Sequence, residues 1–166
     1  MQALHESINE YKIQLEKGVI QIAYKGLMEY IMALRTHFNK KYPDAFVSGS
    51  IYYGYMDMTY FSFTPKSLQQ RKLKIAIVFV HESFRFEVWL AAYNKQVQQK
   101  YWQLFKENNW NKYPIVSSTK GADSIVEHIL ADNPDFRDLA TLTTQLEAGT
   151  NIFIEDVERF LAKFAT

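Results

Sequence analysis

The sequence predicts an α+β fold in which a four-stranded antiparallel meander lies between two helical parts of the chain, with the helices packed mainly on one face of the sheet. Apolar residues recur at helical spacing near both ends, whereas the middle is rich in aromatic and β-branched residues. The connections between the expected strands are short, which indicates antiparallel neighbours. We expect one domain over residues 1–166, made of a helical part at 1–42, the meander at 45–91 and a second helical part at 94–166.

Two helices are expected at the N-terminal end, over residues 3–16 and about 19–41. The first carries its apolar residues at the spacing i, i+4, i+7, i+11, as Leu4, Ile8, Tyr11 and Leu15. Gly18 stands where a helix often ends in a left-handed residue. The second helix has a longer apolar stripe, made of Ile20, Tyr24, Leu27, Ile31, Leu34 and Phe38. Pro43 ends it, because the residue before a proline resists helical geometry.

Four strands are expected next, over residues 46–53, 56–63, 73–80 and 84–90, with a turn at Gly54 between the first two. The third is a continuous apolar segment, which is typical of a buried central strand. The fourth alternates, so its side chains separate onto two faces. One face carries Phe84, Phe86, Val88 and Leu90, and the other carries Arg85, Glu87 and Trp89.

The C-terminal part is expected to be mainly helical. Asn94 is a suitable N-cap for a helix that continues to about residue 107. Residues 114–118 could form a short edge strand. Helices are then expected over about 122–131 and from the Asn133-Pro134 start signal to about residue 148. Gly149 is expected to break the chain before a last amphipathic helix, which carries Phe153, Val157, Phe160, Leu161 and Phe164.

Composition excludes several classes of chemistry and sets an expected location. The chain has no cysteine, which rules out disulfides, thiolate zinc sites and a cysteine nucleophile. Its N-terminal sequence lacks the apolar run of a signal peptide, and no stretch approaches the about 20 apolar residues of a membrane span. We therefore expect a cytoplasmic protein. The net charge of +1 gives no overall bias toward nucleic acid, although basic residues predominate at 58–106 and acidic ones from 122 onward.

The common catalytic and cofactor-binding motifs do not occur in the sequence. There is neither a phosphate-binding loop nor the glycine pattern of a dinucleotide site. Ser48-Gly49-Ser50 lacks the spacing of a nucleophile elbow. The four histidines are not spaced to share a helix or strand face, so no metal site is indicated. We expect no cofactor, and the sequence favours a binding protein over an enzyme without deciding between them.

The residues of chemical interest gather on the predicted sheet and at its end. Tyrosine and tryptophan rings can stack on a planar polar ligand, Arg85 can bind an anion, and Glu87 or Asp57 can accept a hydrogen bond. The candidate ligand-binding residues are Tyr53, Tyr55, Asp57, Tyr60, Arg85, Glu87, Trp89 and Asn94. An alternative assigns Arg85 and Glu87 to a surface ion pair and places Trp89 under a helix.

Two further functions are compatible with this sheet. Asp57 and Glu87 could be the acidic pair of a degenerate restriction-endonuclease-like nuclease, in which two carboxylates hold Mg²⁺ and a lysine positions the attacking water. Val88-Trp89 follows Glu87, however, so the expected Glu-x-Lys lysine is missing. The other function is nucleic-acid binding without catalysis. Bases would stack on Tyr53, Tyr55, Tyr60 and Trp89, and phosphates would meet Lys66, Arg71, Lys72 and Lys74.

Several segments carry a resemblance to a known family. They are Tyr24 to Met28, Phe46 to Phe61, Thr64 to Lys66, Phe86 to Leu90, and Asn94-Lys95. Together they resemble a family of uncharacterised bacterial proteins with a single domain of unknown function, and the resemblance covers most of the chain. It implies a bacterial cytoplasmic protein, and it implies no catalytic role, substrate or cofactor.

We therefore expect a cytosolic binding or interaction module that uses its aromatic, Arg/Glu-bearing sheet face. The partner would be a small polar ligand or a protein, including a second copy of the chain, with nucleic acid less favoured and no membrane partner. A lysine within reach of Asp57 and Glu87 would favour the nuclease instead. The site depends on whether the face of Arg85, Glu87 and Trp89 is open or covered by helices.

Overall fold

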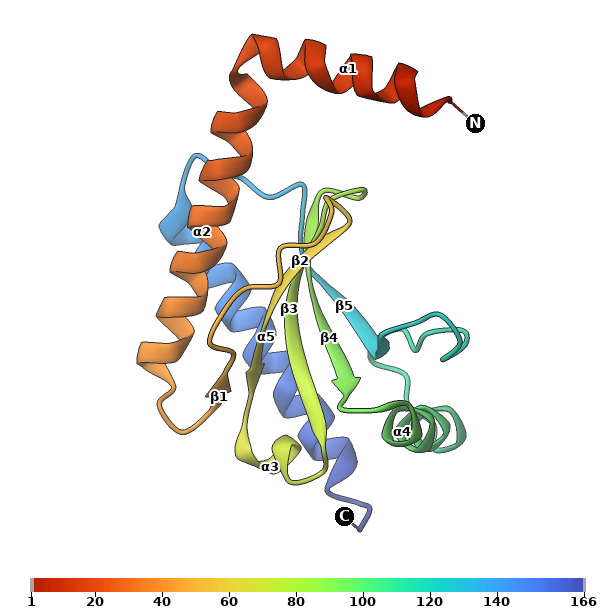
Figure 1. Ribbon diagram of the computed structural model, residues 1–166. Helices are drawn as coiled ribbons and strands as arrows, with labels where there is room; N and C mark the ends of the chain where they lie inside the picture. The colour runs from red at the N-terminus through yellow and green to blue at the C-terminus, as the bar shows by residue number, and fades with distance from the viewer. Residues whose placement is uncertain (1, 166) are drawn as a thin grey trace.

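Five antiparallel strands form one sheet in the order β1-β2-β3-β4-β5 (Figure 1). The computed structural model describes residues 2–165. The strands are β1 (Phe46–Val47), β2 (Met58–Thr64), β3 (Leu73–Val80), β4 (Arg85–Ala92) and β5 (Ser124–Asp132). Each strand pairs with the next one along the chain, so the predicted antiparallel meander is confirmed, and it has one strand more than the four expected.

The helices lie before, within and after the meander. They are α1 (Leu4–Lys17), α2 (Val19–Lys41), α3 (Lys66–Gln69), α4 (Lys95–Glu107) and α5 (Leu139–Leu161). The first two match the prediction, including the break at Gly18, which has a φ of 76° and donates its backbone N–H to the Leu15 carbonyl. Asn94 is the expected N-cap of α4, because its side chain accepts a hydrogen bond from the Val97 backbone N–H.

The hydrophobic core lies between the sheet and the two long helices α2 and α5. Alternate residues of β3 and β4 point toward these helices and are almost fully buried, namely Leu73, Ile75, Ile77 and Phe79 with Phe86, Val88 and Leu90. Phe38 of α2 packs on Phe63 of β2 with ring centroids 4.6 Å apart. Each such side chain stabilises the fold by about 1.5–3 kcal/mol. In Figure 1, α5 crosses behind the strands, so the opposite sheet face is turned toward the viewer.

The segment expected as a helix over 122–131 is strand β5, so that prediction was wrong. β5 pairs antiparallel with β4 from Arg85 opposite Asp132 to Ala91 opposite Ser124. Its β-branched Ile125 and Val126 are fully buried. The apolar spacing of this segment is compatible with a helix, but pairing with the edge of β4 supplies backbone hydrogen bonds and burial that local preference does not.

The expected break at Gly149 and the expected helix start at Asn133-Pro134 were also wrong. One helix, α5, runs through Gly149, and it begins after Asp138, whose side chain accepts from the Thr141 backbone N–H. Gly149 has another role, since a Cβ there would lie 2.7 Å from a methyl carbon of Leu130. The glycine therefore allows α5 to approach β5 closely.

The strand expected over 46–53 is much shorter than predicted. Only Phe46–Val47 forms β1, and the chain then runs irregularly to Met58, where β2 begins, apart from one bridge between Tyr52 and Tyr60. Gly54 turns this segment with a φ of 71°, and a Cβ there would come within 2.2 Å of the Met58 carbonyl oxygen. The edge strand expected at 114–118 is reduced to a bridge between Ile115 and Val126.

Within residues 2–165, none of the helices combines the length and the apolar character that crossing a membrane would require.

Candidate functional site

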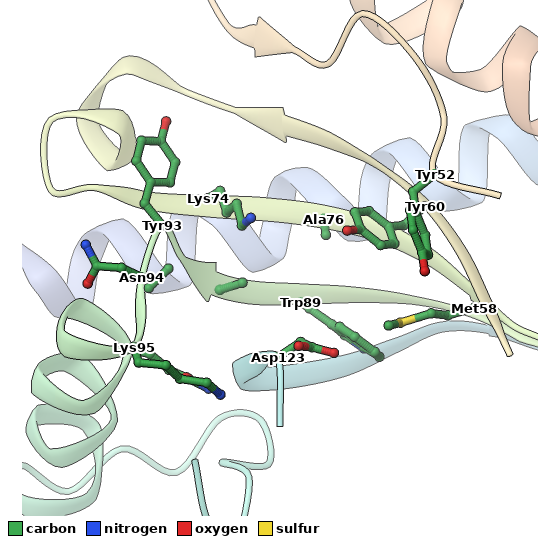
Figure 2. Close-up of a pocket in the computed structure, with 13 residues that line it drawn as sticks. Tyr52, Met58, Tyr60, Lys74, Ala76, Trp89, Tyr93, Asn94, Lys95 and Asp123 are labelled. Atoms are coloured by element: carbon green, nitrogen blue, oxygen red, sulfur yellow. The ribbon is translucent and has the colours of Figure 1, made fainter. Parts of the chain in front are cut away.

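A hollow of about 410 Å³ lies on the sheet face that α2 and α5 leave uncovered, and we call it the sheet-face cavity (Figure 2). Side chains of β2, β3 and β4 form its base, and the start of α4 closes one end. The residues that matter for its chemistry are Tyr60, Lys74, Ala76, Trp89, Ala91 and Asn94. Its volume falls within the about 300–1,000 Å³ that is common for small-molecule sites.

Small side chains in the two central strands create the hollow. Ala76 of β3 lies opposite Trp89 of β4, and Ala91 lies opposite Lys74. Both alanines are nearly buried, although they point away from the core. Alanine reaches only one carbon above the sheet, whereas the neighbouring side chains are larger. The two positions therefore form a hollow in which a ligand can approach the backbone.

Aromatic rings flank the hollow on both sides. Tyr60 of β2 packs against Tyr52 with ring centroids 5.0 Å apart and an angle of 32° between the planes. Burial raises the pKa of Tyr60, and the nearby Tyr52 and Asp123 raise it further, so the phenol keeps its proton at neutral pH and can donate it. Trp89 stands across the floor from these rings (Figure 2).

Glu87 fixes the orientation of Trp89. Glu87 is 4% exposed, and its carboxylate accepts hydrogen bonds from Trp89 Nε1 at 2.9 Å and from Arg85 Nε at 2.8 Å. The three side chains project from one face of β4, as the alternation predicts. Arg85 and Glu87 bind one another, Glu87 also holds the indole ring, and neither residue lines the sheet-face cavity. Trp89 is not under a helix, because it lines the uncovered face.

Of the two lysines at the polar rim of the cavity, Lys74 has an amine without a partner among the described residues. Lys74 makes no hydrogen bond or ion pair with any of residues 2–165, and its amine points along the cavity in Figure 2. Lys95 instead donates to the carbonyls of Thr119 and Ala122, at 3.1 and 2.8 Å. Asn94 caps α4, and Asp123 contributes a carboxylate beside Trp89. A ligand here would therefore meet a positive charge from Lys74 and an acceptor from Asp123.

The remaining predicted site residues lie outside this cavity, in the turn before β2. Tyr55 is 93% exposed, and the Tyr53 carbonyl accepts from the Thr59 hydroxyl. Asp57 accepts from the Tyr55 backbone N–H at 2.8 Å, and backbone hydrogen bonds lower its pKa. Asp57 also borders a second hollow with Trp89 and Glu127. The pKa of Glu127 is raised, mainly by burial and further by the charge of Glu87, although a hydrogen bond from Ser124 lowers it in part.

The geometry of the described residues bears on the nuclease and nucleic-acid alternatives, which stay predictions. Within residues 2–165, no three carboxylate or histidine side chains are grouped so that they could hold a metal ion. Glu87 is committed to Arg85 and Trp89. Of the expected phosphate-binding residues, Arg71 donates to the carbonyls of Leu161 and Phe164, so it fastens the end of α5. Arg71 is therefore engaged at the end of α5 and is not among the cavity residues, whereas Lys74 lines the sheet-face cavity with Tyr60 and Trp89.

The candidate residues chosen from the sequence leave out several that shape the cavity, namely Tyr52, Ala76, Ala91, Tyr93, Gln98 and Asp123. One signal was available for the alanines. Lys74 and Ala76 alternate with the apolar core residues of β3, so a charged and a small residue share the face opposite the core. Asp123 was out of reach, because the segment that follows it was expected to be helical.

The fold and the cavity together define an α+β domain with a five-stranded antiparallel meander that is covered by helices on one face and hollowed on the other. Residues 4–161 match the family described as Domain of unknown function (DUF7000), and the chain belongs to this family. Neither the curated proteins nor the solved structures provide a match to the chain. The family description names no activity.

Proposed function

We propose that the sheet-face cavity binds a small planar ligand that carries a negatively charged group, with the chemistry of a nucleotide or an aromatic carboxylate. The observation that carries this proposal is a hollow floored by Ala76 and Ala91, between the rings of Tyr60 and Trp89, with the uncommitted amine of Lys74 at its side. A concave site with aromatic walls and a few converging polar groups is the usual form of a small-molecule site.

The aromatic walls suit a flat ring. Stacking between aromatic groups contributes about 0.5–1.5 kcal/mol beyond the area that is buried. Trp89 is held in place by Glu87 before a ligand arrives, so little side-chain freedom is lost on binding. This is a reason to keep a charged pair, Arg85 and Glu87, beside a half-buried ring.

The charge of Lys74 sets the preference for an anion. A hydrogen bond between an ammonium group and an anionic oxygen contributes about 1.5–3 kcal/mol. The protonated Tyr60 hydroxyl adds a donor, and the carboxylate of Asp123 can accept from an amino group on the ring. A ring with a donor group at one end and an anion at the other satisfies all of these groups.

A thermal-shift screen tests the proposal. The ligands are nucleoside monophosphates, the matching uncharged nucleosides, aromatic carboxylates, their neutral amides and inorganic phosphate. An anionic planar ligand should raise the melting temperature, with a stabilisation of about 2.7 kcal/mol at 100 times its dissociation constant. Comparison of nucleotides with carboxylates identifies the source of the anion.

Variants locate the binding. Lys74→Ala should weaken the anionic ligand about tenfold and leave its neutral counterpart unchanged, whereas Trp89→Leu should weaken both. Lys100→Ala, on the exposed side of α4, and Tyr55→Ala, in the turn, are the matched controls and should have no effect. The proposal fails if no planar anion stabilises the protein, or if the Lys74 and Lys100 variants respond alike.

A further inference from the structure

Helix α1 has little hydrophobic support from its own chain, because Leu15 is the one residue of its apolar stripe that is partly buried in the described chain. None of its residues is buried. It joins the N-terminal end of α2 at Gly18 and extends over the top of the sheet (Figure 1). A helix of 14 residues is marginal in water on its own, because most helical stability in proteins comes from packing an apolar face. The helix therefore needs a surface to cover it.

The apolar face of α1 is well defined and exposed. Leu4, Ile8 and Tyr11 follow one another at i, i+4, i+7, with exposed fractions of 77%, 53% and 54%. These three residues are anchors at the spacing that a helix uses to lie in an apolar groove. Ile13 is also exposed, but it lies about half a turn away, on the opposite side of the helix.

A groove of about 570 Å³ lies beside the first half of α2. It is bounded by α2, by the turn between β3 and β4, and by the start of α5. Its lining is mostly apolar and includes Ile22, Leu27, Met56, Phe84, Phe136 and Leu139. Four of these residues, Ile22, Met56, Phe84 and Leu139, remain about half exposed or more, so the groove is also without a cover.

The α1 of the same chain cannot lie antiparallel along this α2. Two antiparallel helices need a connection of about 2–5 residues. Here only Gly18 separates Lys17 at the end of α1 from Val19 at the start of α2. The helix can lie in the groove of another copy without this constraint.

The apolar area is sufficient for a dimer. Besides the three anchors and the four exposed groove residues, Val19 and Ile20 are exposed at the start of α2. At about 180 Å² for each large apolar residue, the exposed part of this set amounts to roughly 900 Å² per chain, or about 1,800 Å² for two copies. A stable protein–protein interface buries about 1,200–2,000 Å² in total.

We propose that two copies of this chain exchange α1, so that Leu4, Ile8 and Tyr11 of each copy lie in the apolar groove of the other. The two contacts are equivalent under a two-fold axis, which is the commonest symmetry of homo-oligomers. This interface is separate from the sheet-face cavity, because the two hollows share no residue.

Sedimentation equilibrium tests the dimer. The protein should show twice its chain mass of 19.5 kDa at micromolar concentration. Ile8→Glu places two charges in the dimer interface and should weaken association at least about a hundredfold. Ile13→Glu, the same change on the opposite side of α1, should leave the dissociation constant within about threefold. Since neither residue is buried in the chain, both variants should keep the circular dichroism of the native β-sheet and core helices.

Cross-linking identifies what occupies the groove, because the chain contains no cysteine of its own. Ile8→Cys and Leu139→Cys proteins are mixed and treated with a short bismaleimide. Cross-linked dimers that contain one chain of each variant support the exchange. A protein that is monomeric throughout overturns the proposal, as does an equal effect of the two glutamate variants. A chain that carries both cysteines and cross-links only within itself would assign the groove to its own α1, and this also overturns it.

Discussion

Glu147 of α5 should contribute a large pH-dependent part of the stability of the helical layer. Its carboxylate is nearly buried and joins α5 to the end of α2. It accepts from the Tyr42 hydroxyl at 2.6 Å, pairs with His37 Nε2 at 2.6 Å, and binds the Lys41 amine. Burial of the carboxyl raises its pKa, but hydrogen bonds from Lys41, Tyr42 and His37 outweigh the burial and lower the pKa to about 2.

The magnitude follows from the difference between the folded and unfolded pKa values. A pKa of about 2, against 4.5 for an unperturbed glutamate, corresponds to about 3.4 kcal/mol at 1.36 kcal/mol per pKa unit. The Lys41 side chain is 56% exposed, so solvent screens part of the attraction and we expect about 2 kcal/mol. The folded pKa is depressed, so this stability is present above pH 4.5 and is lost as the pH falls toward 2.

Urea unfolding of wild type and Glu147→Gln at one fixed protein concentration measures this contribution. At pH 7 the variant should be less stable by about 2 kcal/mol, and at pH 3 about one-fifth of that difference should remain. Glu155→Gln, on an exposed position of the same helix, is the control and should change stability by less than about 0.5 kcal/mol. The reasoning is refuted if Glu147→Gln matches the control at pH 7, or if its effect is the same at pH 3.

Two further substitutions test close packing and the support of Trp89. Gly149→Ala should lower the free energy of unfolding by up to about 2 kcal/mol, because moving the Leu130 side chain away from the added Cβ costs about 1–3 kcal/mol and the better helix propensity of alanine returns about 0.5–1 kcal/mol. Gly26→Ala lies in α2, where the added Cβ meets nothing within 4 Å, and should raise the free energy of unfolding by about 0.5–1 kcal/mol. Thermal unfolding measures both changes, and changes of the same sign would contradict this expectation. Glu87→Leu should release the Trp89 ring and reduce affinity for any ligand of the cavity about tenfold, while Glu82→Leu in the β3–β4 turn should not, as isothermal titration can show.

Much of the fold could be predicted because local patterns and tertiary contacts agree there. The stripe from Tyr24 to Phe38 is helical by its spacing and also meets the core, and the alternation from Arg85 to Leu90 matches the two faces of β4, whereas Phe84 lies before the strand and is exposed. The predictions failed where tertiary contacts decide the structure. Residues 124–132 form a strand because they pair with the edge of β4. The helix continues through Gly149, where the absence of a side chain lets α5 pack closely on Leu130.

The candidate site was predictable in part for the same reason. Alternation placed Arg85, Glu87 and Trp89 on one face and raised the question of whether that face is open. The sequence could not show that Arg85 and Glu87 bind each other and the indole, since χ angles and burial decide this pairing. It also could not bring Asp123 beside Trp89, because that contact depends on the β4–β5 pairing.

The most direct test of the proposed function follows the indole N–H signals in a ¹⁵N-resolved NMR spectrum while a stabilising planar anion is added. The chain has three tryptophans, so replacing each in turn by phenylalanine assigns its indole N–H signal. The account predicts that the signal of Trp89 moves, and that those of Trp102 and Trp110 stay, because these two donate to the Val116 and Tyr113 carbonyls away from the cavity. Movement confined to Trp102 or Trp110, with the Trp89 signal unchanged at saturation, would contradict it.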